Sequence, residues 1–345
     1  MRRLLTRRRE ALALVSVLLA LALALAFMTR LTTPKQHAYG SVWGHFLQEE
    51  PDSEDVLFFG SSLVYCDVAP AALWETTGLS SFVMAGPEQT IPMTALYLRE
   101  ALRTQSPQAV FVELTGMFYH RCTNYTKTNV GQMPWGYNRL AATFTEAEPE
   151  VRAGLLFPLL FYHDRWSELT ADDWTVALRG YSRDPLAGYT CMRQWRPSEG
   201  FQVRPPERDP ENFERSWASL VQIRDLCLSR GIIPVFYVAP TLLRVRQADM
   251  DALLARVRAL EGARVLDGNA VFDSPGLDES YDFYDSLHLN VAGARKFTEF
   301  LGGWIRSELA LRPAAARDAA LWRARSEYLR ALEAQPLEQW KPKES

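Results

Sequence analysis

The chain has 345 residues, and 48% of them are hydrophobic, which is enough for one substantial core with appendages. Its 41 acidic and 38 basic side chains give a net charge of -3 at pH 7. This balance lacks the basic surface that phosphate backbones require, so it argues against a nucleic-acid partner.

The N-terminus combines a basic tip with an apolar run. Five arginines lie among the first ten residues, and Ala11–Met28 follow without a charge. At ~1.5 Å rise per residue, these residues almost cross the roughly 30 Å hydrocarbon layer of a bilayer. We expect residues 1–30 to form a cytoplasmic tip and a transmembrane anchor, with the globular part outside the cytoplasm. A cleaved secretory signal is the alternative, but the apolar run exceeds the ~7–15 residues usual for a signal core.

After a linker over residues 31–54, short apolar runs alternate with helical patterns. The predicted strands are Val56–Phe59, Ser81–Ala85, Ala109–Leu114, Ile232–Pro240 and Ala263–Asp267. Helical patterns cover residues 92–105 and 211–231, and Gly231 closes the second as a helix end should. Continuous apolar strands suit a parallel sheet that is covered on both faces. The sequence therefore predicts a doubly wound α/β domain over residues 55–309.

Two segments interrupt or follow this alternation. Residues of about 120–200 are rich in Tyr, Trp, Asn and Pro, and we interpret them as a partly helical insertion beside the functional site. Residues 310–345 form a C-terminal extension whose charged pattern predicts a solvated helix.

The four cysteines, Cys66, Cys122, Cys191 and Cys227, permit one or two disulfides outside the cytoplasm. The four cysteines can equally be small side chains that are buried in the fold without a disulfide. No C-x-x-C pair is present, and the spacings resemble no zinc site. The sequence indicates neither a metal nor a diffusible cofactor.

The first predicted strand runs into Gly60, Ser61 and Ser62, which would lie at the carboxyl end of the sheet, where ligands of such folds bind. A serine hydroxyl becomes a nucleophile only beside a base that a third group orients. Among five histidines, His288 is the best candidate for the base, because Asp285 precedes it by three residues just before a predicted helix.

A strand ending in Gly-x-Ser and a late Asp-x-x-His together resemble the SGNH (GDSL) hydrolase superfamily, over roughly residues 55–305. The resemblance implies a flavodoxin-like sheet. It also implies that Ser62 is the nucleophile and that His288 and Asp285 complete a catalytic triad. The pattern differs from the Gly-x-Ser-x-Gly motif of α/β-hydrolases, because position 64 is valine.

In this superfamily the oxyanion is bound by the backbone of the serine, by a glycine after the second strand and by an asparagine after the third. The matching backbone groups are those of Ser62 and Gly86. The asparagine is missing from its usual place after Leu114, and Asn124 and Asn129 in the insertion are the candidates to replace it.

With an N-terminal anchor, "GSS" early and "DSLHLN" late, the chain resembles the extracytoplasmic proteins of teichoic-acid D-alanylation and of alginate-type polysaccharide O-acetylation. The resemblance implies an extracytoplasmic acyltransferase or esterase that acts on acetyl or D-alanyl esters of a cell-surface glycan or wall polymer. It also implies a multi-spanning membrane O-acyltransferase as partner. The alternative is a non-catalytic assembly or polymer-binding subunit, in which aromatic side chains such as Trp135, Trp166 and Trp174 stack on sugars or form the core of the insertion.

Overall fold

A computed structural model describes the chain except for residues 1, 41, 205–208, 314–317 and 341–345, and it describes no side chains for residues 2–6. The chain divides into two compact units. The larger comprises residues 36–148 and 182–345, and the smaller comprises residues 1–35 and 149–181.

The larger unit is built around a five-stranded parallel sheet with the strand order β2-β1-β3-β6-β8. The strands are β1 (Val56–Gly60), β2 (Ser81–Ala85), β3 (Ala109–Glu113), β6 (Ile233–Val238) and β8 (Arg264–Asp267). Every residue of β1, β2 and β3 is buried, as their continuous apolar sequences predict for strands covered on both faces. The five predicted strands are thus present, with ends that differ by at most two residues.

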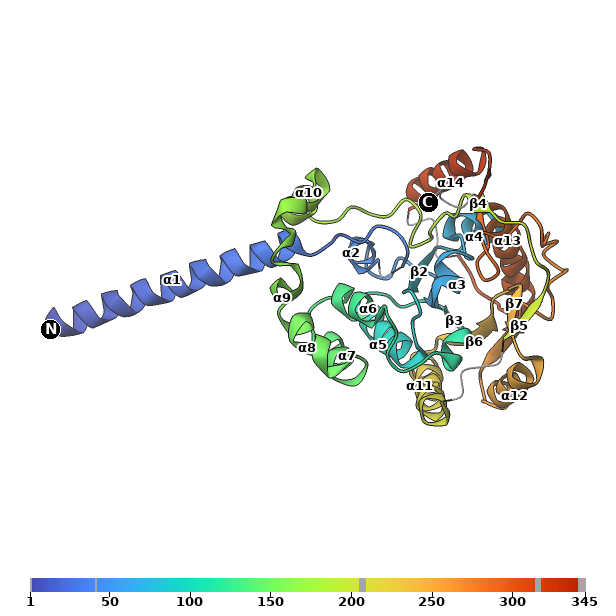
Figure 1. Cartoon of the computed structure of the whole chain (residues 1–345), viewed down its shortest axis with the longest axis horizontal. Coiled ribbons are helices and arrows are strands. Elements are labelled where there is room, and N and C mark those ends of the chain that lie inside the picture. The colour runs from blue at the N-terminus through green and yellow to red at the C-terminus, as the bar shows by residue number, and fades with distance from the viewer. Residues whose placement is uncertain (1, 41, 205–208, 314–317, 341–345) are drawn as a thin grey trace. The chain divides into compact units, whose positions relative to one another are not determined.

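Helices cover both faces of this sheet. Figure 1 shows α5 (Ile91–Ala101) and α11 (Pro210–Ser229) on one side of it and α4 (Pro70–Thr77) and α13 (Val291–Glu308) on the other. Within each pair the two helices contact one another. The larger unit is therefore a mixed α/β fold with a parallel central sheet, as the alternation of apolar runs and helical patterns predicts.

Shorter elements surround this framework. They are α2 (Trp43–Phe46), α3 (Ser62–Tyr65), η1 (Thr115–Phe118), α6 (Thr126–Gln132), α7 (Tyr137–Thr145), β4 (Gln194–Trp195), β5 (Gln202–Arg204), β7 (Leu243–Val245), α12 (Gln247–Arg258), α14 (Ala319–Glu333) and β9 (Glu338–Gln339). Strand β4 pairs with β9 and β5 pairs with β7, both in parallel.

The C-terminal helix α14 is docked on the larger unit, whereas the sequence predicts a solvated helix. It contacts α4 and buries Trp322, Arg325 and Leu329. The Arg325 side chain is 1% exposed and forms an ion pair with the Glu49 side chain, which is 2% exposed. A charged residue on one helical face can thus be a core residue when its partner comes from a distant segment.

The smaller unit contains α1 (Arg2–Thr32), α8 (Pro149–Leu156), α9 (Leu159–Tyr162), η2 (Arg165–Glu168) and α10 (Ala171–Arg179). Residues Arg7–Thr32 form a helix long and apolar enough to cross a membrane. Residues 149–181, the middle of the predicted insertion, group with α1. Only the two ends of the insertion belong to the larger unit.

All four cysteines are free thiols, two buried and two half-buried. Of the two readings that the sequence permits, the structure has small side chains packed in the fold and no disulfide among Cys66, Cys122, Cys191 and Cys227.

Candidate active site

The chain turns sharply at Gly60, where β1 ends and α3 begins. Its φ of 150° lies in a region that L side chains rarely adopt. A Cβ at this position would lie 2.7 Å from Val64 Cγ2 and 2.8 Å from Glu113 Cβ, closer than non-bonded carbons approach. Glycine therefore lets the strand turn directly into the helix, which places the following serines at the carboxyl edge of the sheet.

The two serines after this turn have different roles in the structure. Ser61 is fully buried and caps α3, because its Oγ accepts a hydrogen bond from the Leu63 N–H at 3.4 Å. The same Oγ accepts a hydrogen bond from the Tyr119 hydroxyl at 3.2 Å. Ser62 is half-buried and is the first residue of α3. Ser61 is thus the turn and cap residue, which leaves the Ser62 hydroxyl available for chemistry.

Ser62, His288 and Asp285 form a continuous hydrogen-bonded chain across 226 residues of sequence. Ser62 Oγ lies 2.7 Å from His288 Nε2. His288 Nδ1 lies 2.9 and 3.0 Å from the two carboxylate oxygens of Asp285. A carboxylate accepts only, so Nδ1 carries the proton and Nε2 is free to accept the proton of the serine. The His288 and Asp285 side chains are 19% and 28% exposed, so a substrate can reach them.

Local hydrogen bonds fix the loop that carries Asp285 and His288. Asp285 Oδ1 also accepts the backbone N–H groups of Leu287 at 2.8 Å and His288 at 2.9 Å. The Tyr284 N–H donates to the His288 carbonyl at 2.8 Å. Burial alone would raise the pKa of Asp285, but the hydrogen bond and charge of His288 and these backbone donors hold it below its usual value. Asp285 therefore stays ionised at neutral pH.

Asp67 supports this loop from beneath, and sequence reasoning missed it. It is fully buried, and its Oδ1 accepts the N–H of Leu289, the residue after His288, at 2.9 Å. Among the described residues its Oδ2 has no hydrogen-bond partner. Burial raises the pKa of Asp67 well above its usual value, because the charged form loses its hydration. No motif surrounds Asp67 in the sequence, so nothing local signals its role.

Glu113 ends β3 directly beside Gly60 and is fully buried. Its Oε1 accepts hydrogen bonds from the Thr115 N–H at 2.9 Å and the Thr115 hydroxyl at 2.6 Å. Burial raises the pKa of Glu113 to about 7, although these hydrogen bonds act in the opposite direction. Glu113 thus braces the turn after β3 and takes no direct part in the hydrogen-bonded chain from Ser62 to Asp285.

The backbone amide of Gly86, the expected oxyanion donor, forms a hydrogen bond within the sheet. Its N–H donates to the Gly60 carbonyl at 3.1 Å. The physical reason is the parallel register, in which Gly60 pairs with Ala85, so the next amide along β2 continues the ladder. Glycine is needed here for another reason, because a Cβ would lie 2.3 Å from Asn129 Oδ1.

The three candidate substrate-binding residues are in three different settings. Asn129 is 2% exposed, lies against Gly86, and donates from Nδ2 to the Pro87 carbonyl at 2.9 Å. Asn124 is exposed. Trp135 is 55% exposed, and the Arg139 guanidinium lies 4.0 Å from its ring centroid. The structure therefore brings Asn129, from α6, next to the carboxyl ends of β1 and β2.

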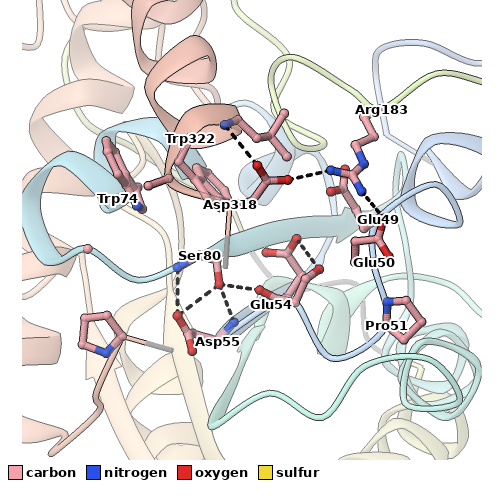
Figure 2. Close-up of a pocket in the computed structure, with 15 residues that line it drawn as sticks. Glu49, Glu50, Pro51, Glu54, Asp55, Trp74, Ser80, Arg183, Asp318 and Trp322 are labelled. Carbon is pink, nitrogen blue, oxygen red and sulfur yellow. Dashed lines mark hydrogen bonds and ion pairs between the residues drawn. The ribbon is translucent and has the colours of Figure 1, made fainter. Parts of the chain in front are cut away.

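A cavity of about 500 Å³ lies at the opposite edge of the sheet. Glu54 and Asp55, which line it, directly precede β1, and Ser80 directly precedes β2. Figure 2 shows Trp74 and Trp322 beside it, and their rings are stacked with centroids 6.4 Å apart.

Most carboxylates around this cavity have partners. Arg183 pairs with Glu50 at 2.6 Å and with Asp318 at 2.8 Å, as Figure 2 shows. Asp55 Oδ2 accepts the N–H and the hydroxyl of Ser80, each at 3.0 Å. No histidine is among the described residues that line this cavity, in contrast to the carboxyl edge with His288.

Within the described part of the chain, no group of three or more His, Cys, Asp or Glu side chains is arranged to hold a metal ion. No protein-family model matches the chain, and the search of curated proteins finds no match. Function is therefore inferred from the geometry of Ser62, His288 and Asp285 and from the resemblance of the two motifs that carry them.

Proposed function

We propose that this chain is a serine-dependent acyltransferase or esterase of the SGNH type. The observation that carries the proposal is the hydrogen-bonded chain from Ser62 through His288 to Asp285. A nucleophile, a base in hydrogen-bond contact with it and a carboxylate that orients the base are the parts that acyl transfer through a serine requires. The strand order of the sheet, which is the flavodoxin-like order, agrees with this assignment.

In the proposed reaction, Ser62 Oγ attacks the acyl carbonyl carbon and its proton passes to His288 Nε2. Asp285 stabilises the imidazolium without taking its proton. Collapse of the tetrahedral intermediate breaks the bond to the leaving oxygen, which takes the proton from Nε2. Water or an acceptor hydroxyl then attacks the acyl-serine and gives its proton to His288 Nε2. Collapse of this second intermediate breaks the bond to Ser62 Oγ, which takes the proton back from Nε2, and releases the acid or the new ester.

The oxyanion needs donors at the carboxyl edge of the sheet. The Ser62 N–H has no acceptor within α3, because Ser62 is the first residue of that helix. With the Gly86 amide paired to Gly60, we assign the second donor to the Asn129 side chain, because it lies against Gly86 next to the carboxyl ends of β1 and β2.

The location and the substrate class follow from the N-terminal helix and the motif resemblance. A spanning α1 with its arginines in the cytoplasm would place residues 36 onward outside. There the substrate would be an acetyl or D-alanyl ester of a cell-surface polysaccharide or wall polymer. A multi-spanning membrane O-acyltransferase would be the partner that supplies acyl groups.

The test is intact-mass measurement of the full-length protein in detergent after treatment with a fluorophosphonate. The parent is compared with Ser62→Ala and with Ser61→Ala, a matched control that removes the neighbouring hydroxyl. We expect one adduct on the parent and on Ser61→Ala, and none on Ser62→Ala.

Two results would contradict the proposal. An adduct that persists in Ser62→Ala places the reactive serine elsewhere. A parent protein that is folded by circular dichroism yet takes up no reagent has no activated serine, which favours the non-catalytic assembly subunit.

A further inference from the structure

The smaller unit exposes large apolar side chains on the segment that packs against the end of α1. They are Phe157 at 67% exposure, Leu160 at 60%, Trp166 at 67%, Trp174 at 46% and Leu178 at 68%, and we call them the 157–178 patch. Exposed apolar side chains are ordinary when scattered singly, but five within 22 residues of sequence require an explanation.

Specific contacts attach this segment to the last turn of α1. Arg30 Nη2 donates to the Val176 carbonyl at 2.9 Å, and Arg165 Nη1 donates to the Thr32 carbonyl at 2.9 Å. The Arg165 guanidinium also pairs with both carboxylate oxygens of Asp173, at 3.0 and 2.9 Å. The segment is therefore held where the apolar helix ends.

One aromatic contact gives the depth of the patch relative to the helix. Phe27 belongs to the uncharged run Ala11–Met28, and its ring centroid lies 6.4 Å from that of Trp174. Phe27 precedes Thr32 by five residues, which is roughly 7–8 Å along a helix. Trp174 therefore lies at the level of the last apolar turn, where a spanning helix passes from hydrocarbon into the headgroups.

Helix α10 separates its buried side from its exposed apolar side. Asp173, Val176 and Ala177 are buried, whereas Trp174 and Leu178, four residues apart and so on one face, are exposed. The outer face of α10 thus carries the large apolar side chains Trp174 and Leu178, although the helix already buries Val176 and Ala177 on its inner face. This arrangement is typical of a helix whose outer face meets an apolar medium.

We propose that the 157–178 patch lies in the interfacial layer of the membrane leaflet from which α1 emerges. The smaller unit then anchors the chain in two ways, because α1 spans the membrane and the 157–178 patch lies in its interfacial layer. Indole rings such as those of Trp166 and Trp174 favour this layer, where the apolar ring and its polar N–H are both satisfied. Continuity with the apolar surface of α1 favours lipid over a protein partner or a sugar chain as the occupant.

This inference depends on α1 spanning the membrane and is independent of the proposed catalysis. The test uses the full-length chain with Cys122 and Cys191 changed to serine and single nitroxide labels at Phe157→Cys, Trp166→Cys or Leu178→Cys. The proteins are reconstituted in vesicles of phosphatidylcholine and phosphatidylglycerol. Collision of each label with lipid-soluble oxygen and with a water-soluble nickel chelate reports its depth.

Two control labels lie in the larger unit, at Leu228→Cys and Tyr328→Cys, whose native side chains are 41% and 45% exposed. We expect the ratio of oxygen to nickel collisions to be severalfold higher at the three patch positions than at the controls. A further label at Leu18→Cys, within the apolar run, should give the highest ratio, because it reports the centre of α1.

The proposal fails if the patch labels collide with nickel as often as the controls do. It also fails if the patch is protected in native membranes but not in pure lipid vesicles, because a protein then covers it. A Leu18 label that is open to nickel would remove the premise that α1 spans the membrane. None of these outcomes affects fluorophosphonate labelling of Ser62.

Discussion

Polar side chains are arranged differently at the two ends of the parallel strands. At the carboxyl edge, hydrogen bonds link the hydroxyl of Ser62 through His288 to the carboxylate of Asp285. At the amino edge, a cavity of about 500 Å³ is lined by carboxylates that arginines and backbone donors neutralise. The cavity is thus lined by groups that are already paired, whereas the proposed nucleophile lies against a proposed base at the other edge.

Two carboxyl groups show the contrast most clearly. Hydrogen bonds from His288 and two backbone N–H groups hold the pKa of Asp285 below its usual value, despite burial. Burial, reinforced by the charge of Glu49, raises the pKa of Glu54 from 4.5 to about 8. The surroundings of Asp285 thus favour its charged form, whereas burial of Glu54 favours its neutral form and makes its ionisation costly.

The largest effect on activity is expected from Asp285→Asn at the carboxyl edge. We expect kcat for hydrolysis of p-nitrophenyl acetate to fall by roughly 10⁴-fold, because an amide no longer holds the Nδ1–H tautomer of His288. The midpoint of thermal unfolding should change little, since the side chain is partly exposed. A variant that keeps most of its kcat would show that Asp285 only shapes the loop.

A smaller effect is expected at the proposed second oxyanion donor. Asn129→Ala should lower kcat on the order of 10²-fold with little change in KM, because the donor acts on charge that develops in the transition state. Asn124→Ala is the matched control, since Asn124 is exposed and should leave kcat unchanged.

Asn129 also supports the turn at Pro87 through a hydrogen bond, so both kcat and thermal stability of the variant are measured. If Asn129→Ala lowers only the unfolding temperature, the residue braces the turn and is not an oxyanion donor.

The smallest effect on activity is expected at the amino edge, where Glu54→Gln should leave kcat unchanged and alter stability. The folded pKa of Glu54, about 8, lies above its ordinary 4.5, so its contribution to folding is complete below pH 4.5 and is lost as pH rises through 8. The unfolding temperature of the variant, relative to the parent, should therefore rise by several degrees between pH 6 and pH 9.

Glu50→Gln is the control for this measurement, because the Glu50 side chain is 71% exposed at the same cavity and has no comparable burial to lose. If the difference in unfolding temperature between Glu54→Gln and the parent is the same from pH 6 to pH 9, Glu54 ionises freely in the folded state. A change in kcat would instead connect the two edges of the sheet.

Local patterns determined much of the fold. Continuous apolar runs predicted the five strands, since a strand covered on both faces has no polar side to display. The Asp-x-x-His spacing predicted the contact of Asp285 with His288, because three residues of a turn bring the two side chains together. The uncharged run near the N-terminus likewise predicted a helix long enough to span a membrane.

Contacts between distant segments decided the rest. Parallel register directed the Gly86 amide to Gly60, and the packing of α6 brought Asn129 to Gly86. The ion pair between Arg325 and Glu49 turned an apparently solvated helix into a docked one.

Distant contacts also decided the role of Asp67, which accepts the N–H of Leu289. They decided the place of residues 149–181, which group with α1 and not with the segments on either side of them. The physical reason is that the strength of a hydrogen bond or a buried ion pair depends on the partner group and on how far both groups are shielded from water. The sequence alone therefore determined the strands, a helix long and apolar enough to span a membrane, and the short contact between Asp285 and His288. Only the tertiary structure decided which distant group faces each polar side chain.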